Sequence, residues 1–437
     1  MIYFRYIKKE QLVFVLFLKK TIMKKRHNAI FVLLILIMLI GITRMAKSDV
    51  CSDSLIYDGF EDVVKIGMDT TGHHWIITRP TKGYFRIIID GQASNQFQAF
   101  KNFKFSPDGN RWACFAKDNV TWNIMTNDTI YELYCDEVLN LGFSPNSQVL
   151  YYAYKIGSQV YYQIGDKNIR GIGGTGDIYV SWGAERYAIG ERRGGKMTYK
   201  LQGWETPPYD EIKPVGFWND GSFIYIVKLG NFWEIYKDKE SISESYINVS
   251  EYAINLTGTA AGFLARRTRS NAVGILLSDD YYEPLITKSY EYVSGLALHP
   301  HIDLMAFKAI YNNSEFIVLS NTEYAGGQEN GNPHWTHDGS QLYFSGCATD
   351  CFINIDGRRY NLNQMFDRME DFVVKPNSNT IAYSTSTTLV VRDLISGTLY
   401  SGMMVDYMTN PIFSWRDNAY LALGVINRRV FLMKCSI

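Results

Sequence analysis

The sequence has no surplus of charge of either sign, since 44 lysines and arginines balance 44 aspartates and glutamates among 437 residues. Beyond the N-terminal segment, no block of like charge stands out. Proteins that bind nucleic acid usually carry a basic surface, because much of their affinity comes from contacts with phosphate groups. The balanced charge therefore argues against a nucleic-acid partner.

A helical pattern is also missing, because nowhere do apolar residues keep a 3.6-residue period over ten residues. Proline is scarce inside the apolar runs, whereas aromatic residues make up 15% of the chain and include 31 tyrosines. Aromatic side chains favour strands. A chain of this length also exceeds the ~250–300 residues at which one core stops growing. The composition therefore predicts an all-β chain, built either as two domains or as an array of repeats.

One short pattern recurs along the chain: an apolar run, a polar turn and a second apolar run. The clearest copies are "FSPDGNRWACF" (105–115), "FSPNSQVLYYAY" (143–154) and "NPHWTHDGSQLYFSG" (332–346). Counted from the first turn residue, the copies begin near residues 69, 106, 144, 181, 218, 257, 299, 336, 375 and 414. Four strand-length runs fill each interval, and in the second interval they are residues 111–117, 120–126, 129–137 and 139–143. Four strands per ~40 residues is the spacing of a β-propeller blade.

We call these ten segments the landmark turns. Proline at the second position fixes φ, and Asn, Asp or Gly after it tolerates a tight reversal. Asp108 stands exposed on such a turn and could pass for a site residue. The recurrence of the turn assigns Asp108 to the architecture instead.

The repeats resemble those of TolB-type and WD-like bacterial β-propellers over about residues 55–435. The resemblance implies four-stranded antiparallel blades and a partner-docking function. It carries over no catalytic residue, because the repeat motifs are structural. The copies at 181, 257 and 299 depart from the pattern, and the Trp-Asp dipeptide of eukaryotic scaffold repeats is absent. Ten copies exceed the usual ~4–8 blades, so a ten-bladed ring, two tandem rings and a ring of seven or eight blades all remain open.

The two ends of the repeat region complement each other. Only two strands, 419–425 and 429–435, follow the last landmark turn, and a spare strand at 55–60 precedes the first. An N-terminal strand that completes the final blade would close the ring and place Cys51 beside Cys435. We predict a disulfide there, which in the chain-entropy description is worth nominally ~5 kcal/mol.

The other cysteines give two further expectations. Cys347 and Cys351 flank a three-residue loop in "CATDC", which places them opposite each other and predicts a second disulfide. Cys114 and Cys135 fall on the first and third runs after a landmark turn, two strand spacings or ~9.5 Å apart. We expect no direct bond between them.

Residues 1–48 form a separate leader. From Met23, which we take as the true start, basic residues 24–27 precede a 14-residue apolar run (29–42) and then "AKS" (46–48). This order is typical of a secretory signal peptide. The run is shorter than the ~20 residues of a spanning helix, and an uncleaved anchor would need its flanks to extend the run. Both alternatives place the propeller, residues 49–437, in the periplasm or at the cell surface, where disulfides persist.

Few residue patterns in the chain point to catalysis. Propeller enzymes place acids or metal ligands on the innermost strands, and the segments expected there contain one carboxylate, Asp371. Glycoside hydrolysis needs two carboxylates ~5–9.5 Å apart, and no G-x-S-x-G elbow occurs. The glycine cluster 171–177 lacks the strand–helix context of a phosphate loop and is interpreted as a hairpin turn. We expect no cofactor.

The histidines are the one suggestive set. Equivalent turns of neighbouring blades lie on one face, so the seventh and eighth repeats could offer a divalent metal two or three imidazoles and a carboxylate. The alternative is that these are solvated turn residues, and the absence of tight ligand spacing favours it. The residues concerned are His299, His301, His334, His337, Asp303 and Asp338.

The sequence thus predicts an exported, monomeric, all-β propeller that binds a protein, peptide or glycan at the bacterial cell envelope. Tyrosine-rich stripes such as residues 151–162 would serve either as a binding platform or for packing between blades. The alternative function is an extracytoplasmic hydrolase or lyase with its site on the loop face.

Overall fold

A computed structural model describes residues 50–279, 283–325, 329–347, 350–362, 372–385 and 387–437. The chain divides into two units, residues 1–51 and 52–437, and the second contains the repeats. Every regular element in the described residues is a β-strand. Among these residues, no helix has the length and apolar character needed to cross a membrane.

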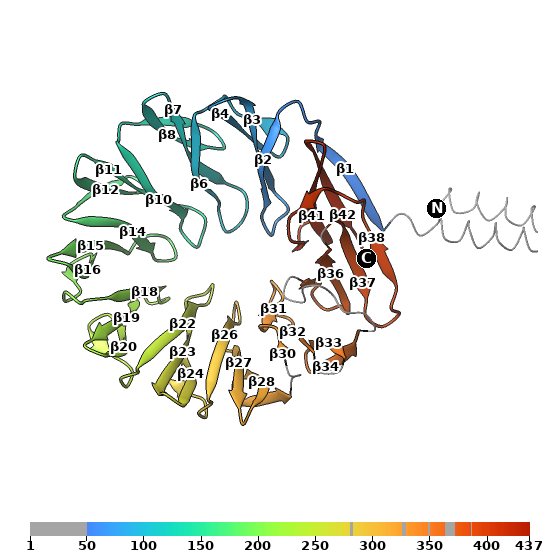
Figure 1. The fold of residues 1–437 in the computed structure, drawn as a ribbon. Coiled ribbons are helices and arrows are strands. Elements are labelled where there is room, and N and C mark those ends of the chain that lie inside the picture. The colour runs from blue at the N-terminus through green and yellow to red at the C-terminus, as the bar shows by residue number, and fades with distance from the viewer. Residues whose placement is uncertain (1–49, 280–282, 326–328, 348–349, 363–371, 386) are drawn as a thin grey trace, which may run out of the picture. The chain divides into compact units, whose positions relative to one another are not determined.

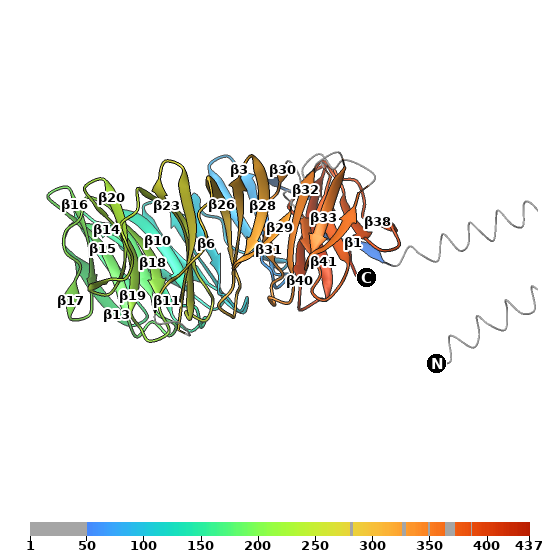
Figure 2. The ribbon, with the colours of Figure 1, turned by 90° about the horizontal axis from the view of Figure 1, so that it is seen from below.

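The strands form ten antiparallel sheets that stand around an axis as the blades of one propeller (Figure 1). Blade 2 shows the common plan: β6 (Ala99–Phe105) is innermost, and β7 (Trp112–Asp118), β8 (Thr121–Thr126) and β9 (Ile130–Leu133) follow outward. Seen from the edge in Figure 2, the strands run steeply between the two faces of the ring. The predicted β-propeller is confirmed, with ten blades; the smaller ring and the two tandem rings are not formed.

The innermost strands share one position in every blade. They are β2 (Asp62–Met68), β6, β10 (Glu137–Phe143), β14 (Gly174–Val180), β18 (Ile212–Phe217), β22 (Asn248–Ile254), β26 (Tyr292–Leu298), β30 (Glu329–Asn330) with β31 (His334–Trp335), β35 (Phe372–Val374), and β39 (Tyr407–Met408) with β40 (Ile412–Ser414).

The second strands lie beside them. They are β3 (His74–Thr81), β7, β11 (Leu150–Ile156), β15 (Tyr187–Arg193), β19 (Phe223–Leu229), β23 (Ala260–Thr268), β27 (Met305–Tyr311), β32 (Leu342–Cys347), β36 (Thr380–Ser384) and β41 (Ala419–Ile426). Each landmark turn joins the first of these strands to the second.

The landmark turn of blade 2 is closed by its own residues. The Ser106 hydroxyl donates to the Asp108 carboxylate at 2.6 Å, and the Gly109 amide donates to the Ser106 carbonyl at 2.8 Å. Burial alone would raise the pKa of Asp108, but hydrogen bonds from Ser106 and Asn110 outweigh it and lower that pKa. Asp108 therefore serves the turn, as its recurrence predicted.

Neighbouring landmark turns are also bonded to one another. Polar groups of one turn reach the next around the ring, through Asp108 N to Ser147 Oγ (3.0 Å), Asn146 N to Trp182 O (3.1 Å), Asn219 N to Gly258 O (2.9 Å), Leu256 N to Pro300 O (3.1 Å) and Ser414 Oγ to Thr71 O (3.1 Å). We call these the inter-turn hydrogen bonds. They lock adjacent blades together on one face of the propeller.

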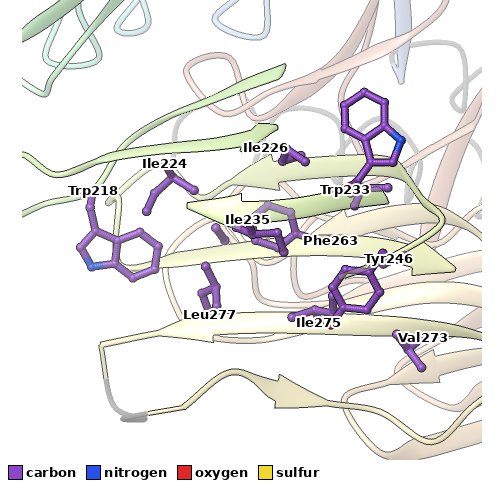
Figure 3. Packing of buried hydrophobic residues seen from close by; sticks show 13 residues of the cluster. Trp218, Ile224, Ile226, Trp233, Ile235, Tyr246, Phe263, Val273, Ile275 and Leu277 are labelled. Carbon is purple, nitrogen blue, oxygen red and sulfur yellow. The ribbon is translucent and has the colours of Figure 1, made fainter. Parts of the chain in front are cut away.

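Apolar packing between blades forms the core. In Figure 3, Trp218, Ile224 and Ile235 of blade 5 face Phe263 and Leu277 of blade 6. The second and third strands, here β19 with β20 (Phe232–Lys237) and β23 with β24 (Asn271–Ser278), provide most of these side chains. Burying one such side chain stabilises the fold by roughly 1.5–3 kcal/mol. Each blade therefore depends on its neighbour for a core.

The ring is closed by the N-terminal strand, as predicted. β1 (Cys51–Tyr57) lies beside β42 (Arg429–Cys435), which continues the sheet of β41 and β40. Arg429 Nε lies 3.0 Å from Asp58 Oδ1 at the end of β1. The closing strand begins and ends earlier than the predicted 55–60, because its pairing with β42 sets its limits.

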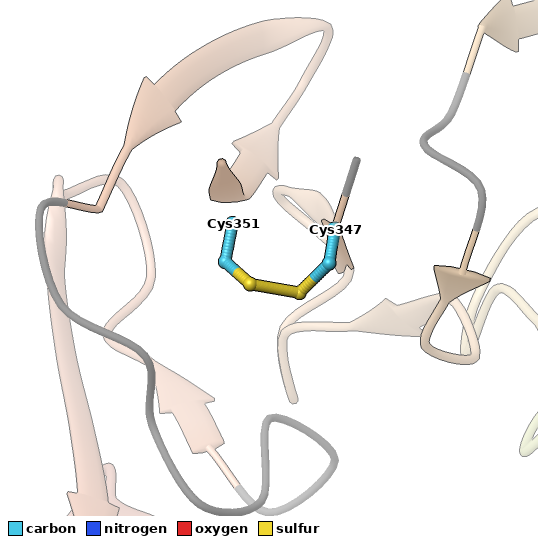
Figure 4. Close-up of a disulfide and its surroundings, with 2 residues drawn as sticks. All are labelled: Cys347 and Cys351. Atoms are coloured by element: carbon cyan, nitrogen blue, oxygen red, sulfur yellow. A yellow bond between two sulfur atoms is a disulfide. The ribbon is translucent and has the colours of Figure 1, made fainter. Parts of the chain in front are cut away.

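The cysteines fall into two classes. A disulfide joins Cys347 and Cys351 across the hairpin of blade 8, with a Cα–Cα distance of 4.0 Å (Figure 4). Cys114 and Cys135 are free thiols. Cys51 and Cys435 are each disulfide-bonded, and their predicted pairing with one another stays a prediction.

Candidate functional site

Two pockets lie side by side along the innermost strands and meet at residues 335–337. The first, of about 380 Å³, is bordered by blades 6, 7 and 8, and we call it the Glu251 pocket. The second, of about 420 Å³, is bordered by blades 8, 9 and 10 and by Thr70 of blade 1, and we call it the Phe372 pocket. Trp335, Thr336 and His337 line both.

Both pockets lie where an Asn-Pro dipeptide interrupts an innermost strand. In blade 8, β30 ends before Asn332-Pro333 and β31 begins after them; in blade 10, Asn410-Pro411 separate β39 from β40 in the same way. Proline has no N–H to give to a β-ladder. The interruptions therefore follow directly from the sequence, and each contributes its asparagine and proline to a pocket wall.

Trp335 forms a fixed ridge between the two pockets. Its indole Nε1 donates to the carbonyl of Ala297 at 3.3 Å. The ring also meets the imidazole of His299 edge to face, with centroids 4.7 Å apart. These contacts come from blade 7 and hold the half-buried indole in place.

Glu251 supplies the charge of the first pocket. Its carboxylate accepts hydrogen bonds from the amides of Gly295 (3.0 Å) and Leu296 (2.8 Å), where β26 bulges. Gly295 has φ +67°, and a Cβ there would lie 2.4 Å from the Asn332 side chain. Among the described residues that line the two pockets, Glu251 is the one carboxylate, and neither lysine nor arginine joins it.

The Phe372 pocket is aromatic. Trp335, Tyr343, Phe372 and Phe413 line it, and the rings of Tyr343 and Phe372 lie 5.3 Å apart. Burial raises the pKa of Tyr343 to about 12, so the phenol stays neutral near pH 7. This pocket therefore offers aromatic faces with a few uncharged polar groups.

The predicted histidines have different roles. The ring of His299 is buried, and its Nδ1 accepts from the amides of His301 (3.0 Å) and Ile302 (3.1 Å). Nε2 therefore carries the proton and donates to the Gly339 carbonyl at 2.9 Å. Burial lowers the pKa of His299, which keeps it neutral. Both ring nitrogens are thus bonded to backbone groups of the landmark turns, and the ring is buried rather than solvated as the second interpretation supposed.

The remaining predicted residues do not gather around one point. His334 and His337 are exposed and line the pockets, whereas Asp338 accepts from Thr336 and Asp303 from Ser278. In the part of the chain that the structure describes, no group of three or more histidine, cysteine, aspartate or glutamate side chains is placed to hold a metal ion.

The count of carboxylates on the innermost strands needs correction. Asp371 lies outside the described residues, but Asp62, Glu137, Asp177, Glu251 and Glu329 all lie on innermost strands. The first four were missed because the strands continue through bulges that look like turns in the sequence, and Glu329 because it precedes the Asn-Pro dipeptide at which the expected segment begins. The glycine cluster 171–177 is an example, since β14 begins at Gly174 and runs through Asp177. The Asn-Pro dipeptides shared by "NPHW" and "NPIF" were the available signal for the pockets.

Comparison with known proteins yields structural likeness only. No family model and no curated protein matches the sequence. The chain is similar to a solved eukaryotic initiation factor (12% identity, TM-score 0.46, covering 70% of this chain and 89% of that one). It is also similar to the Dos1 propeller (10% identity, TM-score 0.38, covering 88% of this chain and 94% of that one). A third similar structure is TolB from Acinetobacter baumannii (10% identity, TM-score 0.29, covering 58% of this chain and 75% of that one).

Proposed function

We propose that this chain is a non-catalytic binding propeller that holds a peptide or glycan segment across its two inner pockets. The observation that carries the proposal is that the two pockets adjoin, because both share residues 335–337 as a common wall. A ligand longer than one pocket can therefore occupy both.

The chemistry of the walls suits such a ligand. Ligand sites are mostly apolar concavities with a few polar groups that fix orientation. Here the asparagine and histidine side chains of residues 332, 334, 337 and 410 border aromatic rings. Amides and neutral imidazoles donate and accept hydrogen bonds, and aromatic faces pack on sugars and on apolar side chains.

One observation favours a hydrolase or lyase instead. Glu251, His334 and His337 line the same pocket, and a carboxylate with imidazoles can transfer protons. Against this, two backbone amides already bind the Glu251 carboxylate. We therefore place binding first.

The site of action that we propose is the bacterial cell envelope, in keeping with the resemblance to TolB-type propellers. The leader, residues 1–48, would export the propeller, residues 49–437, and then be cleaved or serve as an anchor. The disulfide between Cys347 and Cys351 supports an oxidising compartment.

Binding can be tested with the full chain, expressed with its leader and purified from the compartment that it reaches. Peptide and glycan arrays are probed with the wild type, with Trp335→Ala and with Trp182→Ala, whose exposed indole lies on the landmark turn of blade 4. We expect saturable binding that Trp335→Ala reduces about tenfold or more, the equivalent of ~1.4 kcal/mol, and that Trp182→Ala leaves unchanged. Equal binding by all three proteins, or no binding at all, would contradict the proposal.

A further inference from the structure

We infer that the ligand is an extended peptide that places a lysine or arginine side chain in the Glu251 pocket and a large apolar side chain in the Phe372 pocket. This inference rests on the proposed binding function and names its ligand. It follows from the contrast between two adjoining pockets, one with a single negative charge and the other aromatic and uncharged.

The charge of the first pocket is not neutralised from its own walls. Its polar side chains belong to Glu251, Asn332, His334, Thr336 and His337, and of these only Glu251 is charged when the imidazoles are neutral. A carboxylate accepts up to about four hydrogen bonds, and the amides of residues 295 and 296 provide two. Acceptor capacity therefore remains for a cationic donor.

Lysines on neighbouring elements are engaged elsewhere. The ammonium group of Lys213, on β18, donates to the carbonyl of Val249 at 3.1 Å and lies 4.1 Å from the centroid of the Trp233 ring. Lys308, on β27, donates to the carbonyl of Asn330 at 3.2 Å. A cation for Glu251 would therefore come from the ligand.

The second pocket selects by shape and apolar character. Two innermost strands provide Phe372, Val374, Ile412 and Phe413. The fixed ridge of Trp335, in blade 8, closes the opposite side. None of the described residues that line it is a lysine, arginine, aspartate or glutamate. A leucine or aromatic side chain would bury its surface there at little cost in desolvation.

A peptide backbone suits the surface between the two pockets. Asn332 and Asn410 line opposite pockets, and His337 lines both. An amide side chain can pair with both the N–H and the C=O of a peptide group. In an extended segment, side chains two residues apart point the same way. A basic residue and an apolar residue separated by one other residue would therefore both point toward the pockets.

The test measures fluorescence anisotropy with labelled peptides in a Ser-Gly host. The central triplet is Lys-Ser-Phe, with Gln-Ser-Phe and Lys-Ser-Ser for comparison, and neutral chito-oligosaccharides form a separate arm. We expect each replacement to weaken binding to the wild type about tenfold, as expected for loss of a charge-assisted hydrogen bond or of a buried ring. The preference for Lys over Gln should shrink below about twofold in Glu251→Gln.

The matched control is Glu137→Gln, which neutralises an innermost-strand carboxylate of blade 3 outside both pockets. It should keep the preference for Lys. If Glu251→Gln does not fold, the comparison of Lys with Gln peptides on the wild type still decides.

The outcomes separate the two proposals. Oligosaccharide binding that depends on Trp335, with no preference for Lys-Ser-Phe, would overturn the peptide inference and leave the binding function standing. Binding of neither peptide nor oligosaccharide would overturn the peptide inference, and the array experiment described above decides the binding function separately. A preference for Lys that survives in Glu251→Gln would show that another group provides the charge, which also overturns the inference.

Discussion

The hydroxyl of Ser414, in the tenth landmark turn, donates a hydrogen bond of 3.1 Å to the backbone carbonyl of Thr71, in the first. The two residues are 343 positions apart in the chain, and both are buried. The bond continues the series of inter-turn hydrogen bonds across the point where the chain ends meet. Ring closure therefore involves this bond near the axis as well as the outer strand β1.

Ser414→Ala tests the inner part of the closure. The change leaves the Thr71 carbonyl without this donor and removes a hydroxyl that also bonds Asp417. We expect a loss of about 1–3 kcal/mol in the free energy of unfolding, measured by urea denaturation. Ser158→Ala, at an exposed position between β11 and β12, should change it by less than about 0.5 kcal/mol. Equal changes in the free energy of unfolding for the two variants would show that the Ser414 hydroxyl does not contribute to ring closure.

Gly109→Ala tests the packing of one landmark turn on the next. Gly109 has φ +73°, and a Cβ there would lie 2.4 Å from the hydroxyl oxygen of the buried Thr71. Gly91→Ala is a matched control, because Gly91 has φ +83° and open space around it. We expect Gly91→Ala to cost about 1–2 kcal/mol and Gly109→Ala about 1–3 kcal/mol more. Thermal midpoints that fall equally would refute tight packing at this turn.

His299 should make stability depend on pH. Burial lowers its pKa below the ordinary 6.5, so the unfolded chain binds the proton first as the pH falls. The stabilisation is complete above about pH 6.5 and is lost progressively below it. His299→Ser gives the turn the residue that blades 2, 3 and 4 have at this position, and should flatten that slope.

Unfolding midpoints of both proteins between pH 8 and pH 5 test this expectation. His74, whose pKa burial also lowers, is present in both proteins and cancels in the comparison. Parallel slopes for the two proteins would show that His299 does not titrate in this range.

The free thiols should be unreactive in the folded chain. Burial raises the pKa of Cys114 to about 12, and burial together with Asp136 raises that of Cys135 to about 11. Since the thiolate is the reactive form, iodoacetamide at pH 8 should label neither thiol until the chain is denatured. Rapid labelling of Cys135 in the native protein would contradict this.

The disulfides are tested by digesting the alkylated protein without reduction and analysing the peptides by mass spectrometry. The digest should contain one cross-linked peptide from Cys347 with Cys351 and another from Cys51 with Cys435. Alkylated Cys51 and Cys435 in the exported protein would remove the predicted closing disulfide.

The local pattern of the sequence was enough to predict the blades. In blade 2, the predicted runs 111–117, 120–126 and 129–137 correspond to strands at 112–118, 121–126 and 130–133. Turn chemistry and strand alternation act over a few residues, so they can be followed along the chain. The third run was too long because Glu137 belongs to the next innermost strand, which a linker precedes.

The pockets could not be derived in this way. Glu251, Asn332, Phe372 and Phe413 are up to 162 positions apart, and only the closed ring sets their neighbours. Bulges shift the innermost strands at several blades, and the sequence does not show which residues they redirect toward the axis. His299 was offered as a candidate metal ligand, but its imidazole takes the place that serine has in other landmark turns.

The position of β1 in the last blade also constrains the timing of folding. Its partner β42 is synthesised only after more than 370 further residues. At ~5–20 residues per second, β1 waits roughly 20–75 s without a sheet. Most of its side chains remain solvent-exposed even in the finished blade, which limits the apolar surface that the waiting strand offers to other chains. β1, the first of the described strands to be made, is thus among the last to find its partner, and the ring closes fully only after β42 has been made.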